Sequence, residues 1–227
     1  MKKLLGIVAV CCILVTSQFS CSGDDDSTKD SIKNIDGTWI YCPSCLGEGF
    51  LSAKIYSFNL KEQTFKYYEI VNLLNPTSGD LIKVQKTTFE GTFKLGQTSL
   101  IDDGTEENYA TEIDLTFSNI TLLPLSDEGA QFLNGKHPEF TGGGAYLEIS
   151  DWTNGVAKSI NGLSGFPEVG SSFYELFLIN QDSITLFLSN KSSGEIINPD
   201  NRPKAIDTSI GYLHTQEGSN IYNLIFN

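Results

Sequence analysis

An alternation of apolar and polar side chains with a period of two constrains the fold of this chain more than any other feature. In the segment 88–95, Phe89 and Phe93 point one way and the polar residues between them point the other. The segment 112–118 repeats the pattern. Successive side chains of a β-strand lie on opposite faces, so this pattern is typical of half-buried antiparallel strands. The sequence therefore predicts a fold built almost entirely of β-strands.

The pattern predicts about eight to ten strands with turn residues between them. A short helix is expected over Ser126–Asn134, with Ser126 or Asp127 as its N-cap. Residues 35–227 show no shift in composition and no internal repeat, so they are expected to form a single all-β domain. This domain is an antiparallel up-and-down barrel with one or two short helices or, alternatively, a sandwich of two sheets. The ten expected strands are 38–41, 54–60, 64–71, 88–95, 112–118, 146–149, 173–180, 183–189, 209–215 and 220–226, and 156–160 is a candidate for a further short strand.

The first twenty residues have the pattern of a secretory signal peptide. A basic start, Met1–Lys3, is followed by the apolar run Leu4–Val15 and then by small polar residues. This run is too short to cross the roughly 30 Å hydrocarbon core of a bilayer as a helix. We therefore expect residues 1–20 to be removed and exclude them from fold reasoning.

The end of this signal resembles a bacterial lipobox, in the sequence Gln18-Phe19-Ser20-Cys21. The resemblance implies cleavage before Cys21 and acylation of its thiol and amine. The next run, Ser22–Ser27, resembles the acidic export signal of Bacteroidota-type surface lipoproteins. It implies a lipid-anchored outer-membrane protein at the cell surface, with the periplasmic face as the alternative. Residues 21–34 are then a lipidated cysteine and a disordered acidic tether.

The charge of the chain argues against a nucleic-acid partner. The full sequence has 15 basic and 28 acidic residues, and residues 1–20 contribute two lysines and no acid. The processed chain therefore carries 13 basic and 28 acidic residues, a net charge of −15. Such a surface repels phosphate backbones and anionic headgroups. We expect a monomer that meets the membrane only through its N-terminal lipid.

The sequence Gly37-Thr38-Trp39, at the start of the folded region, resembles the G-x-W signature of lipocalins and the wider calycin group. The resemblance implies an eight-stranded barrel over residues 35–227, in which Trp39 plugs the closed end. It also implies that a basic side chain late in the domain packs over this tryptophan. Arg202, the single arginine of the chain, is the candidate, with Lys204 and Lys191 as rivals.

Two cysteines, Cys42 and Cys45, remain once the signal is removed and Cys21 is acylated. An even pair in an exported protein most often forms a disulfide. A redox role is an alternative, although it usually needs the first thiol at a helix N-terminus. Zinc is another, although it needs four ligands and only His137 and His214 could join the cysteines.

Catalytic motifs are not evident in the sequence. Ser164 lacks the G-x-S-x-G frame of a nucleophile elbow, and no Ser/His/Asp spacing appears. The acidic residues around Gly104 are read as a solvated turn, with calcium binding as the alternative. We therefore expect no enzyme activity, no cofactor and no metal.

The aromatic residues are the strongest functional lead, because ligand cavities are mostly apolar with a few polar groups. Their positions on alternating strands predict that they either line a cavity in the barrel or fill its core. The first case predicts binding of a small apolar or amphipathic ligand. The alternative is a β-sandwich module that binds glycans or proteins as an accessory to outer-membrane uptake. The ligand-binding candidates are Phe58, Tyr67, Phe89, Phe93, Phe117 and Tyr174.

Overall fold

The computed structural model describes residues 35–43, 45, 51–102, 107–140, 143–180, 184–189, 198–216 and 219. The expected signal peptide, the acylated Cys21, the tether and the expected last strand, 220–226, lie outside these residues. So does the centre of the acidic turn, residues 103–106. None of the helices in the described part of the chain is long and apolar enough to cross a membrane.

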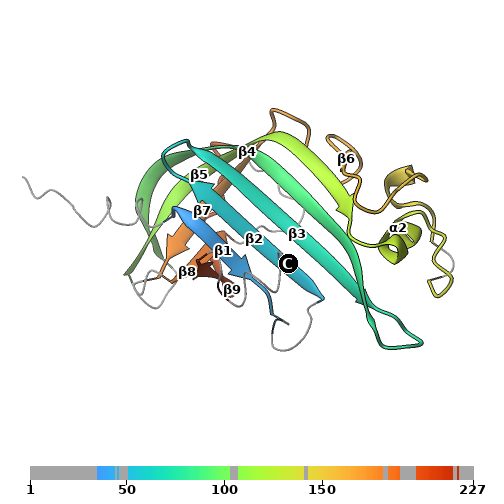
Figure 1. Ribbon diagram of the computed structural model, residues 1–227. Coiled ribbons are helices and arrows are strands. Elements are labelled where there is room, and N and C mark those ends of the chain that lie inside the picture. Colours follow the sequence, from blue (N-terminus) through green and yellow to red (C-terminus); the bar gives the residue numbers. More distant parts are fainter. Residues whose placement is uncertain are drawn as a thin grey trace, which may run out of the picture.

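Eight antiparallel strands close into one barrel (Figure 1). They follow each other around the barrel in the order β1-β2-β3-β4-β5-β7-β8-β9, and β9 pairs back onto β1. The predicted all-β, up-and-down, calycin-like barrel is therefore confirmed, and a sandwich of two open sheets is excluded. The strands are β1 Gly37–Tyr41, β2 Ser52–Asn59, β3 Thr64–Leu74, β4 Leu81–Asp102, β5 Glu107–Pro124, β6 Lys158–Ser159, β7 Ser172–Ile179, β8 Thr185–Ser189 and β9 Ile206–Thr215.

The register of β1 shows how the barrel closes. Trp39 lies opposite Tyr56 of β2 on one side and opposite His214 of β9 on the other. The strand that removes the edge of the sheet is thus β9. Full closure leaves no row of unpaired backbone groups between β1 and β9.

The two longest strands, β4 and β5, extend well beyond the segments 88–95 and 112–118 that the sequence predicts. Their pairing shifts between Glu90 and Gly91, where one residue of β5 is left over. A β-carbon on Gly91 would lie 2.0 Å from the carbonyl oxygen of Thr116. Glycine is therefore required for this close approach, and such a bulge bends the strands around the core.

The connection from β5 to β7 lies against β4 and β5 at one end of the barrel, where α2 and β6 lie in Figure 1. Helix α2, Asp127–Leu133, is capped by Ser126, one of the two predicted N-caps, whose hydroxyl accepts a hydrogen bond from the amide of Gly129 at 2.8 Å. The segment expected to be a strand at 146–149 instead contains a 3₁₀ helix, Tyr146–Glu148. Three buried residues of this connection, Leu133, Trp152 and Ile160, belong to the main core.

The directions of the strands define two different ends. At one end lie the start of β1, the end of β9 and the turns β2–β3 and β7–β8, the first of which is short. At the other lie the longer connections β1–β2, β5–β7 and β8–β9. We call the first, where Trp39 of β1 lies, the closed end and the second, where the longer connections lie, the open end.

Candidate ligand-binding site

Trp39 fills the closed end. Its side chain is fully buried, and its indole Nε1 donates a hydrogen bond to the carbonyl oxygen of Ile35 at 2.8 Å. The ring centroid of His214 lies 4.7 Å from that of Trp39. A buried tryptophan with its single donor satisfied seals this end with a large packed ring.

Gly37 permits this packing. Its φ of 110° falls where side chains are rarely tolerated, and a β-carbon there would lie 2.6 Å from Nε2 of His214. The neighbouring Asp36 accepts a hydrogen bond from the amide of Leu60 at 2.7 Å, which ties the β2–β3 turn to the start of β1. Glycine is therefore needed both for the backbone conformation and for room.

The expectation that Arg202 covers Trp39 is corrected by the structure, in which His214 packs there. Arg202 precedes β9 at the open end, whereas Trp39 pairs with the last residues of that ten-residue strand. At about 3.3 Å per residue the two lie roughly 30 Å apart along the chain direction. Arg202 instead forms ion pairs on the outside of the barrel, with Asp114 and, at 3.6 Å, with Glu112.

Tyr174 also lies on the outer face and is not a cavity residue. The guanidinium of Arg202 stands 5.3 Å from the centre of its ring. The neighbouring Phe173 points inward, with its ring 4.8 Å from that of Phe117. The prediction that Tyr174 is a ligand-binding residue is therefore wrong.

Aromatic side chains line a cavity of about 260 Å³ inside the barrel. Three of the predicted binding residues, Tyr67, Phe89 and Phe117, belong to this lining. Phe173, 40% exposed, stands at its edge, together with Gly165 and Pro167 of the β5–β7 connection. We call this space the aromatic compartment; its wall also includes Tyr56, Phe65 and Leu115.

A second space of about 310 Å³ shares Tyr56 and Tyr67 with the first. We call it the polar compartment, because hydroxyl, carboxyl and amino groups project into it. Cavities that bind small ligands commonly reach this size and combine an apolar wall with a few polar groups. The remaining lining residues are Lys54, Glu175, Leu188, Ser189, Asp207, Ile210 and Tyr212.

Tyrosine rings form the wall between the two compartments. The ring of Tyr56 stacks on that of Tyr67 at 4.5 Å and meets that of Tyr212 edge-on at 5.3 Å. Burial raises the pKa of all three hydroxyls above the usual value, and the negative charge of Glu175 adds to this for Tyr56 and Tyr212. These hydroxyls are therefore neutral hydrogen-bonding groups at physiological pH.

Glu175 is a carboxylate inside the barrel. It lies opposite the core residue Ile113 in the β5–β7 register, and its side chain is only 5% exposed. The hydroxyl of Ser189 donates a hydrogen bond to it and accepts one from the amide of Leu176 at 3.2 Å. Two strands, β7 and β8, thus fix the carboxylate at the wall of the polar compartment.

The other predicted binding residues, Phe58 and Phe93, lie in the packed core and do not line either compartment. Their rings meet edge-on at 5.4 Å.

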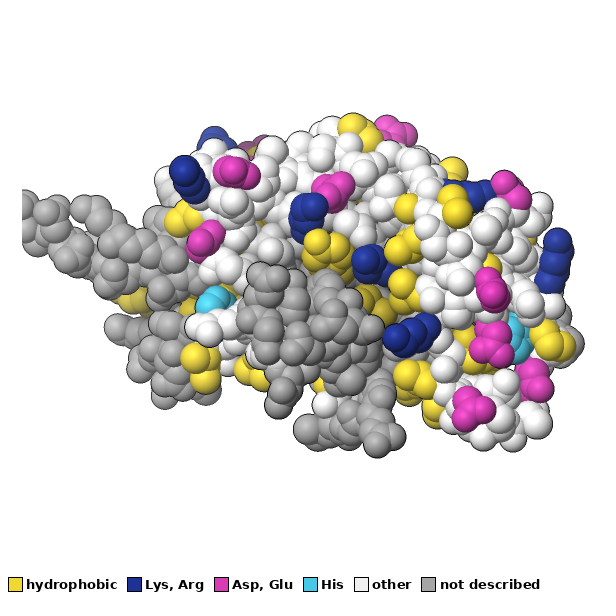
Figure 2. Space-filling view, in the orientation of Figure 1, with side chains coloured by type: hydrophobic (Ala, Val, Ile, Leu, Met, Phe, Trp, Pro, Cys, Tyr) yellow, Lys and Arg dark blue, Asp and Glu magenta, His cyan; other side chains and the backbone are white. Residues whose placement is uncertain are grey.

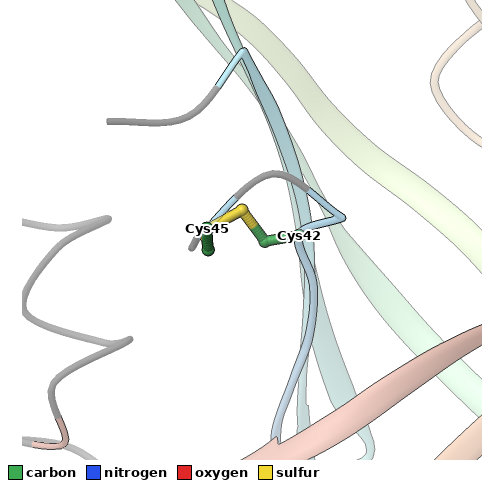
Figure 3. The surroundings of a disulfide bond; sticks show 2 residues. All are labelled: Cys42 and Cys45. Atoms are coloured by element: carbon green, nitrogen blue, oxygen red, sulfur yellow. A yellow bond between two sulfur atoms is a disulfide. The ribbon is translucent and has the colours of Figure 1, made fainter. Parts of the chain in front are cut away.

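Cys42 and Cys45 form a disulfide after β1 (Figure 3). The described residues contain no group of three or more His, Cys, Asp and Glu side chains that could hold a metal ion.

On the face shown in Figure 2, basic and acidic side chains are interspersed, and hydrophobic side chains lie in small groups among them.

Sequence reasoning missed the residues that give the site its polarity, Lys54, Tyr56, Glu175 and Tyr212. Glu175 is the one charged residue of β7, which sets it apart in the sequence but does not tell which face of the strand it lies on.

The fold and the cavity together define a class of molecule, a closed eight-stranded calycin-like barrel with a hollow beyond the end that Trp39 plugs. No protein-family model matches the chain, and no curated protein matches it by sequence.

Proposed function

We propose that this protein is a lipid-anchored binding protein that takes a small apolar or amphipathic ligand into its barrel and acts without catalysis. The observation that carries the proposal is the pair of adjoining compartments inside the barrel. An aromatic wall supplies apolar contact area, and the tyrosine hydroxyls and Glu175 orient a polar group.

The N-terminal sequence supports the anchoring part of this proposal. Acylation of Cys21 would hold the protein in the outer membrane, at the cell surface or on the periplasmic face. The test is the substitution Cys21→Ser followed by fractionation of the cells. Release of the protein from the membrane fraction is expected, and unchanged retention there would contradict anchoring.

Binding is tested by titrating the purified protein with N-phenyl-1-naphthylamine, a neutral apolar dye that fluoresces when it leaves water. Leu115 is buried in the wall of the aromatic compartment, so Leu115→Trp should fill the space that the dye occupies. We expect this substitution to weaken binding by at least about tenfold, because it exchanges open volume for a clash.

The matched control is Leu213→Trp, the same exchange at a residue of β9 that is 47% exposed. This variant should bind the dye as the unmodified protein does. No binding by the unmodified protein, or equal binding by the two variants, would contradict the proposed site.

A further inference from the structure

The wall of the aromatic compartment is richer in rings than the burial of apolar surface requires. Of the nine described residues that line it, six carry aromatic side chains, and only Leu115 and Pro167 contribute aliphatic ones. An alkyl chain gains from the apolar area that it covers, which leucine and isoleucine supply as well as phenylalanine does. A wall built mainly of rings therefore offers a ligand more than apolar area.

The rings of this wall stand at different angles to one another. Phe117 meets Phe65 at 77°, with 5.7 Å between the ring centroids, and it meets Phe89 at 61° and 6.0 Å. The ring of Phe89 is tilted by 40° against that of Tyr67, at 5.2 Å. Aromatic pairs are favourable both when offset-stacked and when edge-to-face. A flat ring that enters the compartment can therefore stack on one of these side chains while it meets another with its edge.

The size of the aromatic compartment suits a fused pair of rings. A dry apolar cavity of about 150 Å³ holds one benzene ring. The aromatic compartment measures about 260 Å³, so it has room for a second ring fused to the first. It shares Tyr56 and Tyr67 with the polar compartment, so a short polar substituent on the rings can lie beside that compartment.

We propose that the cavity selects flat bicyclic aromatic ligands, which contact the rings of Tyr67, Phe89 and Phe117 in the aromatic compartment, over saturated ligands of the same skeleton. This inference rests on the proposed function and names the ligand class for the same site. Each aromatic pair strengthens binding by roughly twofold to tenfold beyond the burial of apolar area. A saturated skeleton gains the burial but not this additional part.

The test compares two neutral alcohols with the same carbon skeleton, 2-naphthalenemethanol and its fully saturated analogue decahydro-2-naphthalenemethanol. Each carries one primary hydroxyl and is titrated calorimetrically into the purified protein at pH 7, below its solubility limit. Each affinity is divided by the partition coefficient of the alcohol between octanol and water, which removes the difference in hydrophobicity. After this correction we expect the aromatic alcohol to bind at least about fivefold more tightly.

The substitution Phe89→Leu separates the contribution of a ring from that of apolar packing. Leucine keeps an apolar side chain in the wall of the compartment but removes the ring that lies beside Tyr67 and Phe117. Affinity for the aromatic alcohol should fall about fivefold, and affinity for the saturated one should stay within about twofold. The readout is the ratio of the two affinities in one protein sample, which a partial loss of folding does not change.

The matched control is Phe132→Leu, the same exchange in helix α2. Phe132 is partly buried, its ring meets that of Phe140 edge-on at 5.3 Å, and it lines neither compartment. This variant should keep the ratio of the unmodified protein within about twofold. An unchanged ratio in Phe89→Leu, or an equal change in both variants, would contradict the role of the ring of Phe89.

The outcomes separate this inference from the function on which it rests. Failure of both alcohols and of N-phenyl-1-naphthylamine to bind overturns the inference and the binding function together. Binding of the dye with no binding of the alcohols, or with equal corrected affinities for the two, supports the binding function and overturns only the preference for flat aromatic rings.

Discussion

The two ends of the barrel interior are built from the same strands but to opposite effect. At the closed end, Trp39, Gly37 and His214 pack so tightly that a single added carbon at Gly37 would collide with the histidine ring. Toward the open end the inward side chains are phenylalanines, tyrosines and a carboxylate, and they line two compartments of about 310 and 260 Å³. Tyr56 lies opposite Trp39 in the β1–β2 register, at the boundary between the packed closed end and the two compartments.

This difference shows how one barrel separates stability from binding. At the closed end the indole of Trp39 has its one polar group hydrogen-bonded to the carbonyl oxygen of Ile35, so its burial has little polar cost. Hydroxyl and carboxyl groups need hydrogen-bonding partners, so a wall that carries them is not readily packed shut. We therefore expect substitutions at the closed end to act on folding and substitutions in the compartments to act mainly on binding.

The largest effect should come from Trp39→Ala at the closed end. Removing a fully buried indole leaves a cavity and an unpaired carbonyl at Ile35, so we expect a loss of about 3–5 kcal/mol in the free energy of unfolding. Urea denaturation measures this loss. The control is Leu213→Ala on the exposed face of β9, and a loss for Trp39→Ala as small as that of the control would remove the distinction between the ends.

The sequence indicated this end of the barrel but not the partner of the tryptophan. Alternation predicts an all-β barrel or sandwich, and the resemblance of Gly37-Thr38-Trp39 to the G-x-W signature implies a barrel that Trp39 plugs. In an up-and-down barrel with an even number of strands, the last strand ends where the first begins. His214, near the end of β9, therefore reaches Trp39, whereas Arg202, before that strand, lies at the opposite end. Counting strand directions would have shown this.

Which side chains of β7 face the interior of the barrel could not be predicted from the residues of this strand. Both of its faces are apolar, because Phe173 and Phe177 face the core while Tyr174 and Leu176 are covered on the outside by Arg202 and Ile206. A period-two pattern fixes the inward face only where the other face is polar. For the same reason Glu175 could not be placed inside the barrel from its sequence alone.

Alkaline unfolding should test the tyrosines of the compartments. The pKa values of Tyr56, Tyr67 and Tyr212 are raised by burial, so above pH 10 the unfolded chain loses protons that the folded chain keeps. Stability is therefore intact below about pH 10 and falls above it, by about 1.4 kcal/mol per pH unit for each tyrosine. Unfolding by urea at several pH values measures the slope.

Replacing one of these tyrosines gives the control for that experiment. Tyr212→Phe removes one titrating hydroxyl and keeps the ring, so the slope above pH 10 should become less steep by about 1.4 kcal/mol per pH unit. Tyr109→Phe, at an exposed residue of β5, should leave the slope unchanged. An equal slope in both variants would mean that the hydroxyl of Tyr212 titrates freely in the folded protein.

The smallest effect is expected for Arg202→Met. This arginine joins Asp114 and Glu112 on the outside of the barrel, and partly exposed ion pairs contribute about 1 kcal/mol or less. Thermal or urea unfolding at low and at high salt measures the loss, which salt should reduce. A loss equal to that of Trp39→Ala would return the closing role to Arg202.

The most direct test of the account is to locate a neutral amphiphile bound to the protein in solution. Intermolecular nuclear Overhauser effects between the alkyl protons of 1-decanol and the side chains of the protein would report which residues it touches. The account predicts contacts with the rings of Phe89 and Phe117 in the aromatic compartment and none with Leu213 on the outer face. Contacts confined to the outer face, with none to either ring, would contradict it.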